Sequence, residues 1–360
     1  MSDHTAGPAV TDRHPNINPH SACLSVPEDT AENNPRRYRI HAQRLVDTRT
    51  LDRASWLALR RRGIGSSDAA AAIGLNPYQS PLALWLEKTG RACEDQEPSP
   101  ESRLSSPLYW GQVLEPIVAE HYAQHTGYSV RRVNAILQHR EHHWMLANLD
   151  REILGQDDVH LLECKTAGLH GARLWDQGVP EYIQLQVQHQ LAVTGQKAAD
   201  VAVLLAGQDL QIHRIDRDET LIAALIRLEE AFWQQVVTDQ PPPADGSDSS
   251  ERALRTLFPQ DNGDTLDFST DPQLNQVFCD LQQVRQTLTE QQQEEARLKQ
   301  RLQEAMGNAS QATLLSGRLS WKLSASSQRL DTRALQRDHP ELCQRYLKTV
   351  PGSRRFLVRD

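Results

Sequence analysis

The chain has 360 residues, of which 38% are hydrophobic and 24% are charged, so it can form one large globular domain or two ordinary ones. Its 39 basic and 47 acidic residues give a net charge of −8, which argues against indiscriminate binding of polyanions. No apolar run is long enough to cross a bilayer, and the first residues lack a signal-peptide pattern, so we expect a cytoplasmic protein. The five cysteines form no CxxC pair, so neither a zinc ribbon nor a disulfide framework is indicated.

The first predicted elements are a polar leader and a glycine turn. Residues 1–40 are rich in Pro, Asn, Asp and Ser without apolar periodicity, which predicts disorder. Arg60 to Pro81 then reads RRRGIGSSDAAAAIGLNPYQSP, a Gly-Ile-Gly turn followed by an alanine-rich run that predicts a helix. A glycine turn that opens a helix is a common way to hold a phosphate. A nucleotide-cofactor site is not favoured, because GIGSSD lacks the third glycine of a Rossmann motif and no GK[ST] follows.

A polar insert and a helix come next. Cys93 to Pro107 interrupts the apolar pattern and predicts a surface loop. A helix is predicted over Tyr109–Thr126, because apolar residues recur there at helical spacing and Gly127 is a good residue to end it. Glu115 lies beside the apolar stripe of this helix, where it could reach a metal site at a junction between helix and sheet.

The strongest chemical signal is a predicted β-hairpin. Two strand-like runs, WMLANLDREILG from Trp144 and VHLLECKTA from Val159, are separated by the turn-forming residues GQDD. Residues two apart on a strand point to one face, so Glu163 and Lys165 should project together while Cys164 turns into the core. If the hairpin brings Asp150 to the same face, two carboxylates and the Cys164 carbonyl make an oxygen cage suited to Mg²⁺.

Lys165 has two possible roles beside such a cage. Its ammonium could help to deprotonate an attacking water, or it could neutralise the charge that builds on a phosphate during cleavage. An ExK sequence alone is a weak signal, since on most strand edges it is only an exposed ion pair.

Three further elements complete the predicted core. A helix over Glu181–Thr194, a hairpin over Val201–Asp216 and an amphipathic helix over Glu219–Val237 follow in order. The first of these helices carries more glutamines than a solvent face needs, and one of them could hydrogen-bond a carboxylate ligand or the attacking water. These residues are Gln184, Gln186, Gln188 and Gln190.

The remainder of the chain divides into three predicted segments. Residues 239–272 begin with a run rich in Pro, Gly and Ser and read as a linker. Residues 273–306 carry leucines at seven-residue intervals and predict an amphipathic, coiled-coil helix. Residues 307–360 form a small basic module. From residue 318 onward it contains ten Lys and Arg residues but only four Asp and Glu residues. Such a tail could lie on nucleic acid.

Four segments in one order resemble the YqaJ-type viral recombinases, relatives of the phage lambda exonuclease within the PD-(D/E)xK superfamily. They are LRRRGIGSSDAAAAIGLNPYQSPLALWLEKTG, WGQVLEP, ANLDREILG with LLECKTA, and QLQVQHQLAVTG. The resemblance spans roughly Leu51 to Val237. It implies a restriction-endonuclease-like α/β core over residues 41–238, with a mixed central sheet flanked by helices, followed by the coiled-coil helix and the basic module.

The resemblance implies a metal site. Glu115 in WGQVLE, Asp150 in ANLD and Glu163 in ECK would hold Mg²⁺, with Mn²⁺ as a substitute, together with the backbone carbonyl of Cys164. A further acidic ligand is left open, and the candidates by proximity are Asp157 and Asp158.

The resemblance also implies catalytic and DNA-binding residues. Lys165 would be the catalytic lysine, and Gln186 in LQVQ would be a polar helper. Lambda-exonuclease-like enzymes hold the 5′-phosphate of a DNA end with an arginine that follows a Trp, and with a serine seven residues later. Trp56, Arg60 and Ser67 reproduce this spacing, so Arg60 and Ser67 are the expected 5′-phosphate ligands.

The function implied is that of a Mg²⁺-dependent exonuclease that degrades double-stranded DNA ends from 5′ to 3′ and leaves a 3′ single strand for recombination. A single-strand annealing protein is the implied partner, and a homo-oligomer, for which a ring is one form, is the implied assembly. The alternatives are an endonuclease or repair nuclease of the same fold, and a DNA-binding protein without catalysis. The set of Asp150, Glu163 and Lys165 argues against the last, because a pure binder has no use for carboxylates that repel phosphates.

Overall fold

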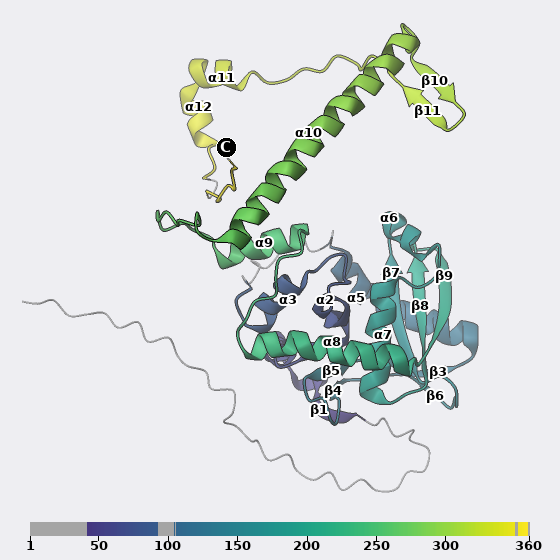
Figure 1. Ribbon diagram of the computed structural model, residues 1–360. Coiled ribbons are helices and arrows are strands. Elements are labelled where there is room, and N and C mark those ends of the chain that lie inside the picture. The colour runs from purple at the N-terminus through teal and green to yellow at the C-terminus, as the bar shows by residue number, and fades with distance from the viewer. Residues whose placement is uncertain (1–41, 93–103, 105, 350–351, 359–360) are drawn as a thin grey trace, which may run out of the picture.

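The computed structural model describes residues 42–92, 104, 106–349 and 352–358. The predicted leader and most of the predicted polar loop lie outside these ranges. The described chain is a mixed α/β structure with two core sheets, a covering layer of helices and a C-terminal extension that holds a third, two-stranded sheet (Figure 1). Within the described residues, no helix combines the length and apolar character needed to span a membrane.

The smaller of the two core sheets carries the glycine turn. Its strand order is β1-β4-β5-β2, and its strands are β1 Gln43–Asp47, β2 Ile64–Gly65, β4 Ala135–Gln138 and β5 Met145–Asn148. Helix α1 (Arg53–Arg60) leads into β2, which pairs in parallel with β5. The 3₁₀ turn η2 (Ser66–Asp68) and the short helix α2 (Ala69–Ala72) follow β2 directly.

The five-stranded sheet carries the predicted hairpins. Its order is β3-β6-β7-β8-β9, and its strands are β3 Ser129–Arg132, β6 Arg151–Leu154, β7 Leu161–Ala167, β8 Ala198–Leu205 and β9 Asp209–Asp216. Strands β6 and β7 pair antiparallel, β7 and β8 pair parallel, and β8 and β9 pair antiparallel. The sheet is therefore mixed, as predicted, and both hairpins are present.

One prediction about the strands was wrong. The run from Trp144 to Gly155 is not a single strand, because it divides into β5 and β6, which belong to different sheets. The chain crosses from one sheet to the other at Leu149 and Asp150. Asp150 therefore lies at the junction of two sheets rather than near the end of one strand, and there its carboxylate accepts a hydrogen bond from the backbone N–H of Cys164.

Helices cover both faces of the five-stranded sheet. Helix α5 (Pro107–Thr126) packs on one face, where its Tyr122 shares a core cluster with Leu162 and Cys164. Helix α7 (Glu181–Thr194) packs on the other face with Val201. Gly127 ends α5 in the left-handed region at φ +74°, as the sequence predicts. The alternation of strand residues thus separates the two cores.

A second core joins the covering helices. Helices α3 (Pro81–Lys88), α8 (Glu219–Val237) and α9 (Asp248–Leu257) share a cluster that contains Trp85, Phe232 and Ala253. Helix α9 lies inside the predicted linker of residues 239–272, and the Ser249 hydroxyl accepts a hydrogen bond from the Ser80 N–H at 3.0 Å. The predicted linker is therefore structured in part, while the division of the chain into domains stays a prediction.

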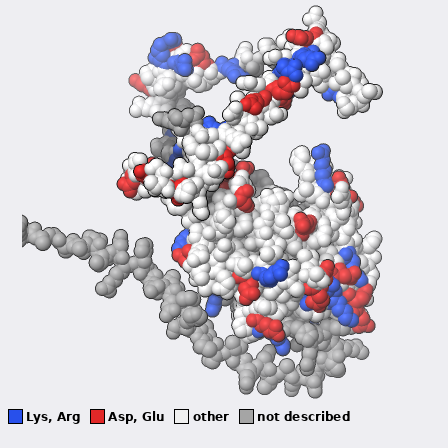
Figure 2. All heavy atoms as spheres, viewed as in Figure 1, with Lys and Arg blue, Asp and Glu red and all other residues white. Residues whose placement is uncertain are grey.

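The C-terminal extension leaves this core as one long helix. Helix α10 (Pro272–Met306) contains no buried residue and projects away from the two sheets (Figure 1). The hairpin of β10 (Gln311–Leu314) and β11 (Gly317–Ser320) and the short helices α11 (Thr332–Asp338) and α12 (Pro340–Arg345) follow. In Figure 2, basic side chains gather over α11, whereas the core carries both signs of charge on the face shown.

Candidate active site

The predicted catalytic strand places its side chains as the sequence analysis expected. Leu162 and Cys164 of β7 face α5, whereas Leu161 faces α7. Glu163 and Lys165 point with Leu161 toward α7, where both contact Gln186. Burial and the charge of Asp150 raise the pKa of the Cys164 thiol, so this cysteine is an inert core residue and not a nucleophile.

Gln186 bridges the carboxylate and the ammonium. Its Nε2 donates to Glu163 Oε1 at 2.6 Å, and its Oε1 accepts from Lys165 Nζ at 3.0 Å. Lys165 also lies 2.7 Å from Glu163 Oε1. Gln190, one helical turn further along α7, donates to Glu163 Oε2 at 2.7 Å. Both oxygens of the nearly buried Glu163 are therefore held by fixed donors.

The ionisable groups at this site shift each other's pKa values. Burial, followed by the charges of Glu163 and Glu115, raises the pKa of Asp150 to about 8. Burial acts to lower the pKa of Lys165, but the charge of Glu163, the hydrogen bond to Glu163 and the charge of Asp150 together outweigh it, so this pKa is raised. Lys165 is therefore a cation at neutral pH, which favours charge neutralisation over proton abstraction as its role.

Glu115 approaches the site but faces a cation of the protein itself. Its Oε1 accepts from Arg151 Nη1 at 2.6 Å, and the same nitrogen donates to the carbonyl of Asp150 at 2.7 Å. Among the described residues, no group of three or more His, Cys, Asp or Glu side chains is arranged to hold a metal ion. The predicted three-carboxylate set is thus not assembled, although its members are neighbours.

The donor chemistry nevertheless fits a divalent cation. Asp150 and Glu163 are hard oxygen ligands, which Mg²⁺ prefers. Their mutual repulsion, visible in the raised pKa of Asp150, is relieved when a cation lies between them. Asp158, which was a candidate for a further ligand, instead lies within 2.6 Å of Arg214 and is largely exposed. Asp150 and Glu163 are the ligands that the site supports best.

The glycine turn is held tightly against β5. The N–H of Ile64 donates to the carbonyl of Trp144 at 2.7 Å. A Cβ atom built on Gly63 would lie 2.4 Å from that carbonyl oxygen, so only glycine allows this approach. The alanine run is helical as predicted, but α2 spans only Ala69–Ala72. A helix this short contributes little dipole, so side chains must supply most of any phosphate-binding charge at this turn.

Arg60 ends the helix before this turn and Ser67 follows the turn, and the side chains of these two predicted 5′-phosphate ligands are in contact. Arg60 Nη2 donates to Ser67 Oγ at 3.2 Å and to Asp68 Oδ1 at 2.6 Å. The guanidinium carbon of Arg60 also lies 4.9 Å from the ring centre of Trp56. Arg60 is partly accessible and Ser67 is exposed, so both can be reached by a ligand.

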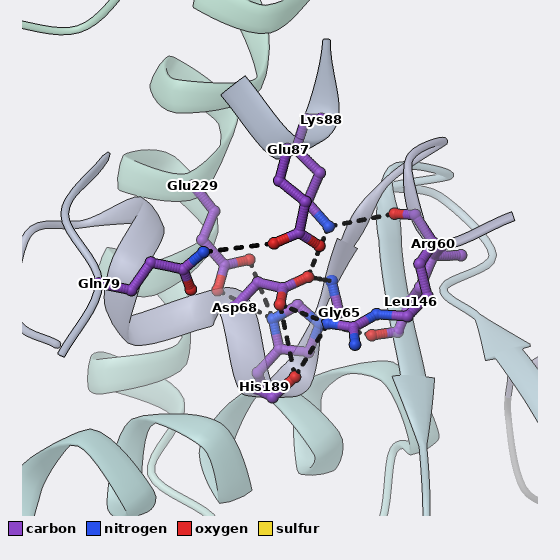
Figure 3. A network of polar contacts seen from close by, with 10 residues as sticks. Arg60, Gly65, Asp68, Gln79, Glu87, Lys88, Leu146, His189 and Glu229 are labelled. Carbon is purple, nitrogen blue, oxygen red and sulfur yellow. Dashed lines mark hydrogen bonds and ion pairs between the residues drawn. The ribbon is translucent and has the colours of Figure 1, made fainter. Parts of the chain in front are cut away.

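Helix α7 connects the glycine turn with the carboxylate site. The turn η2 packs against α7, and His189, which lies between Gln186 and Gln190, is fully buried. His189 contacts Glu229 at 2.8 Å through Nδ1 and the carbonyl of Leu146 at 3.0 Å through Nε2 (Figure 3). Both partners are acceptors, so both ring nitrogens donate, and although burial acts to lower the pKa of His189, Glu229 raises it.

Three residues of these networks were not assigned by the sequence analysis: Asp68, Lys88 and His189. Gln190 was one of the four candidate glutamines, and its i,i+4 spacing to Gln186 places both on one helix face. Asp68 and Lys88 are separated by a turn and a helix, and His189 lies in a glutamine-rich helix whose sequence pattern does not mark it. No sequence signal brings these three together.

Comparisons with known proteins show which family the chain resembles. Residues 55–197 match the family model described as the YqaJ-like viral recombinase domain, and all the predicted site residues lie within them. The chain is 33% identical over 326 residues to the uncharacterized protein YqaJ of Bacillus subtilis (strain 168), and the alignment covers 89% of this chain and 98% of the relative.

Two solved structures are similar at lower identity. An alkaline exonuclease from Laribacter hongkongensis is 21% identical, with a TM-score of 0.43, and covers 57% of this chain and 100% of its own. A phage related exonuclease from Haemophilus somnus 129PT is 12% identical, with a TM-score of 0.33, and covers 51% of this chain and 99% of its own.

Proposed function

Because the chain belongs to the YqaJ-like viral recombinase domain family, we propose that it is a Mg²⁺-dependent exonuclease that degrades double-stranded DNA from 5′ to 3′. Its product would be a 3′ single strand, which a single-strand annealing protein uses in recombination. We further propose that it works as a homo-oligomer, for which a ring around the DNA is one form, in the cytoplasm of a bacterial or phage-infected cell.

One observation carries this proposal. Glu163, Lys165 and Gln186 form a closed set of contacts of 2.6 to 3.0 Å, and Asp150 lies beside them with a pKa raised to about 8. A purely structural ion pair does not need a second, mutually repelling carboxylate next to it. Perturbed carboxylates beside a lysine are typical of sites that handle a metal and a phosphate.

The residues divide the chemistry between them. Asp150 and Glu163 would hold the metal, with the Cys164 carbonyl as a third oxygen, and Glu115 would join them if it leaves Arg151. A divalent cation at this place supplies positive charge to the phosphate and makes water a stronger nucleophile. Gln186 and Gln190 fix the orientation of Glu163 through its two oxygens.

Lys165 would stabilise the transition state by charge. Its ammonium is held by Glu163 and Gln186, so it needs no reorganisation when negative charge grows on the phosphate oxygens.

Upstream, Arg60 and Ser67 would bind the terminal 5′-phosphate and so fix which end of the strand is cut first. Arginine suits this role because its planar fork of N–H groups matches phosphate oxygens.

The role of Lys165 is tested by Lys165→Met, which keeps the length of the side chain and removes the charge. We expect the rate of DNA cleavage with Mg²⁺ to fall by about 100-fold or more, while binding of duplex DNA changes little. Lys197→Met is a matched control, because Lys197 is exposed and its ammonium donates to the backbone carbonyl of Asp157 at 3.4 Å. Retained cleavage by Lys165→Met would refute the proposed role.

A further inference from the structure

A carboxylate and an ammonium are buried directly behind the proposed 5′-phosphate ligands. Asp68 accepts from Arg60 Nη2 at 2.6 Å, from Lys88 Nζ at 2.6 Å and from the Gly65 N–H at 2.9 Å (Figure 3). The Asp68 side chain is 4% exposed, and that of Lys88 is completely buried. Burial acts to raise the pKa of Asp68, but Lys88 and Arg60 lower it overall, so the carboxylate is ionised.

These contacts fix the guanidinium of Arg60 on two sides. Asp68 and Ser67 both take their hydrogen bonds from Nη2, and the ring of Trp56 covers one face of the group. Nε and Nη1 of Arg60 donate no hydrogen bond to any residue in the described part of the chain. A fixed guanidinium with free N–H groups is prepared for phosphate oxygens, because little rotamer freedom is lost on binding.

The charges explain why Lys88 is buried there. A carboxylate beside a phosphate site repels the ligand, and Arg60 paired with Asp68 alone would have no net charge. Lys88 adds a second cation that is fully removed from solvent, and its Nζ also donates to the carbonyl of Arg60 at 3.1 Å. Arg60, Asp68 and Lys88 together carry a net charge of +1, so the site keeps its attraction for an anion.

We propose that Asp68 and Lys88 are positioning residues for recognition of the 5′-phosphate at a DNA end. Asp68 holds the guanidinium of Arg60 beside Ser67, and Lys88 compensates the charge of Asp68. This inference rests on the proposed function, since it concerns how that activity selects its end. It assigns the discrimination between phosphorylated and hydroxyl 5′ ends to two residues that never touch the DNA.

The experiment compares kcat/KM on linear duplexes with 5′-phosphoryl and with 5′-hydroxyl ends, and the readout is their ratio. Arg60→Ala sets the ratio expected when the phosphate ligand is absent. Asp68→Asn removes the anchor of Arg60, and Asp68→Asn with Lys88→Met removes both buried charges while keeping their volumes. This double variant leaves no uncompensated buried charge, so it should fold even if the single variant does not.

A matched control separates positioning from stability. Asp200 is also a buried carboxylate, 3% exposed, and it accepts from Tyr122 OH and Arg214 Nε. It contacts neither the glycine turn nor Glu163. Asp200→Asn should therefore lower the melting temperature and leave the phosphoryl-to-hydroxyl ratio at the wild-type value.

We expect the double variant to lower the ratio by about 10-fold or more, the effect of one lost charge-assisted hydrogen bond, mainly through a higher KM on phosphorylated ends. Lys88→Met alone should also raise that KM, because the net positive charge is lost. A folded double variant with the wild-type ratio would overturn the inference and leave the proposed function intact. A wild-type protein without any end preference would overturn the inference together with the proposed role of Arg60 and Ser67, whereas the proposed exonuclease activity is tested separately by the polarity of digestion.

Discussion

Asp150 changes its protonation state near neutral pH because its partly buried carboxylate lies beside a second one. Burial and the charge of Glu163 raise its pKa to about 8, whereas the ordinary value is 3.8. Between these two values the folded, metal-free protein binds more protons than the unfolded chain. The contribution of Asp150 to the stability therefore falls as the pH rises from about 4 through about 8, a sign opposite to that of a salt-bridged aspartate.

Asp150→Asn should remove this pH dependence. In the presence of a chelator, we expect the variant to gain stability relative to the wild type between pH 5 and pH 9, by at least ~1.4 kcal/mol, the value of one pKa unit. Urea unfolding of both proteins at pH 5 and at pH 9 measures this difference in the free energy of unfolding. Asp209→Asn removes an exposed carboxylate at the start of β9 and should follow the wild type. If the stability of the wild type and of Asp150→Asn changed equally with pH, the raised pKa of Asp150 would be contradicted.

Gln190 should affect the metal rather than the fold of α7. Gln190→Leu removes the donor to Glu163 Oε2, and we expect the Mg²⁺ concentration for half-maximal cleavage to rise by about 10-fold to 100-fold. Gln188→Leu is the control, since Gln188 contacts the backbone of Asp216 and Asp218 instead. Equal shifts in both variants would show that Gln190 acts only through stability.

At the residue scale, the sequence predicted what local geometry determines. The shared direction of Glu163 and Lys165 follows from the period of a strand, and it is confirmed by their contacts with Gln186. The pairing of Asp68 with Lys88 could not be predicted, because 20 residues separate them and only the packing of α3 against the glycine turn brings them together.

At the scale of elements, the periodic segments were predicted well and the junctions were not. Helices α7 and α8 begin and end at the predicted residues. The split of Trp144–Gly155 into β5 and β6 depends on which strands pair, which one strand's sequence does not determine. The short α2 has a local cause, since Gly74 adopts the left-handed region at φ +77° and ends the helical run.

Helix α9 should be necessary for the stability of the core. A chain ended after Thr238, where the core was predicted to close, loses the packing of Ala253 and Leu257 on α3 and the hydrogen bond of Ser249. We expect it to be less stable by about 2–4 kcal/mol than a chain ended after Gln260. Chemical denaturation compares the stability of the two shortened chains. Equal midpoints would show that α9 contributes nothing to the stability of the core.

At the scale of the whole molecule, the two sites are joined by the same helix. Helix α7 packs against the turn that carries Ser67 and also holds Glu163 through Gln186 and Gln190. Its buried His189 contacts the carbonyl of Leu146 on β5, the strand that precedes Asp150. An enzyme that binds a terminal phosphate and cuts the adjacent bond needs such a fixed relation between its two sites.

The most direct test of the central claim is digestion of duplex DNA with Mg²⁺ and no other factor. The substrates are a linear duplex labelled separately on each strand, with and without 5′-phosphates, and a covalently closed circle. The account predicts that linear DNA loses nucleotides from its 5′ ends, faster when these are phosphorylated, and that the circle stays intact. Cleavage of the closed circle, or removal of nucleotides from the 3′ ends first, would contradict it.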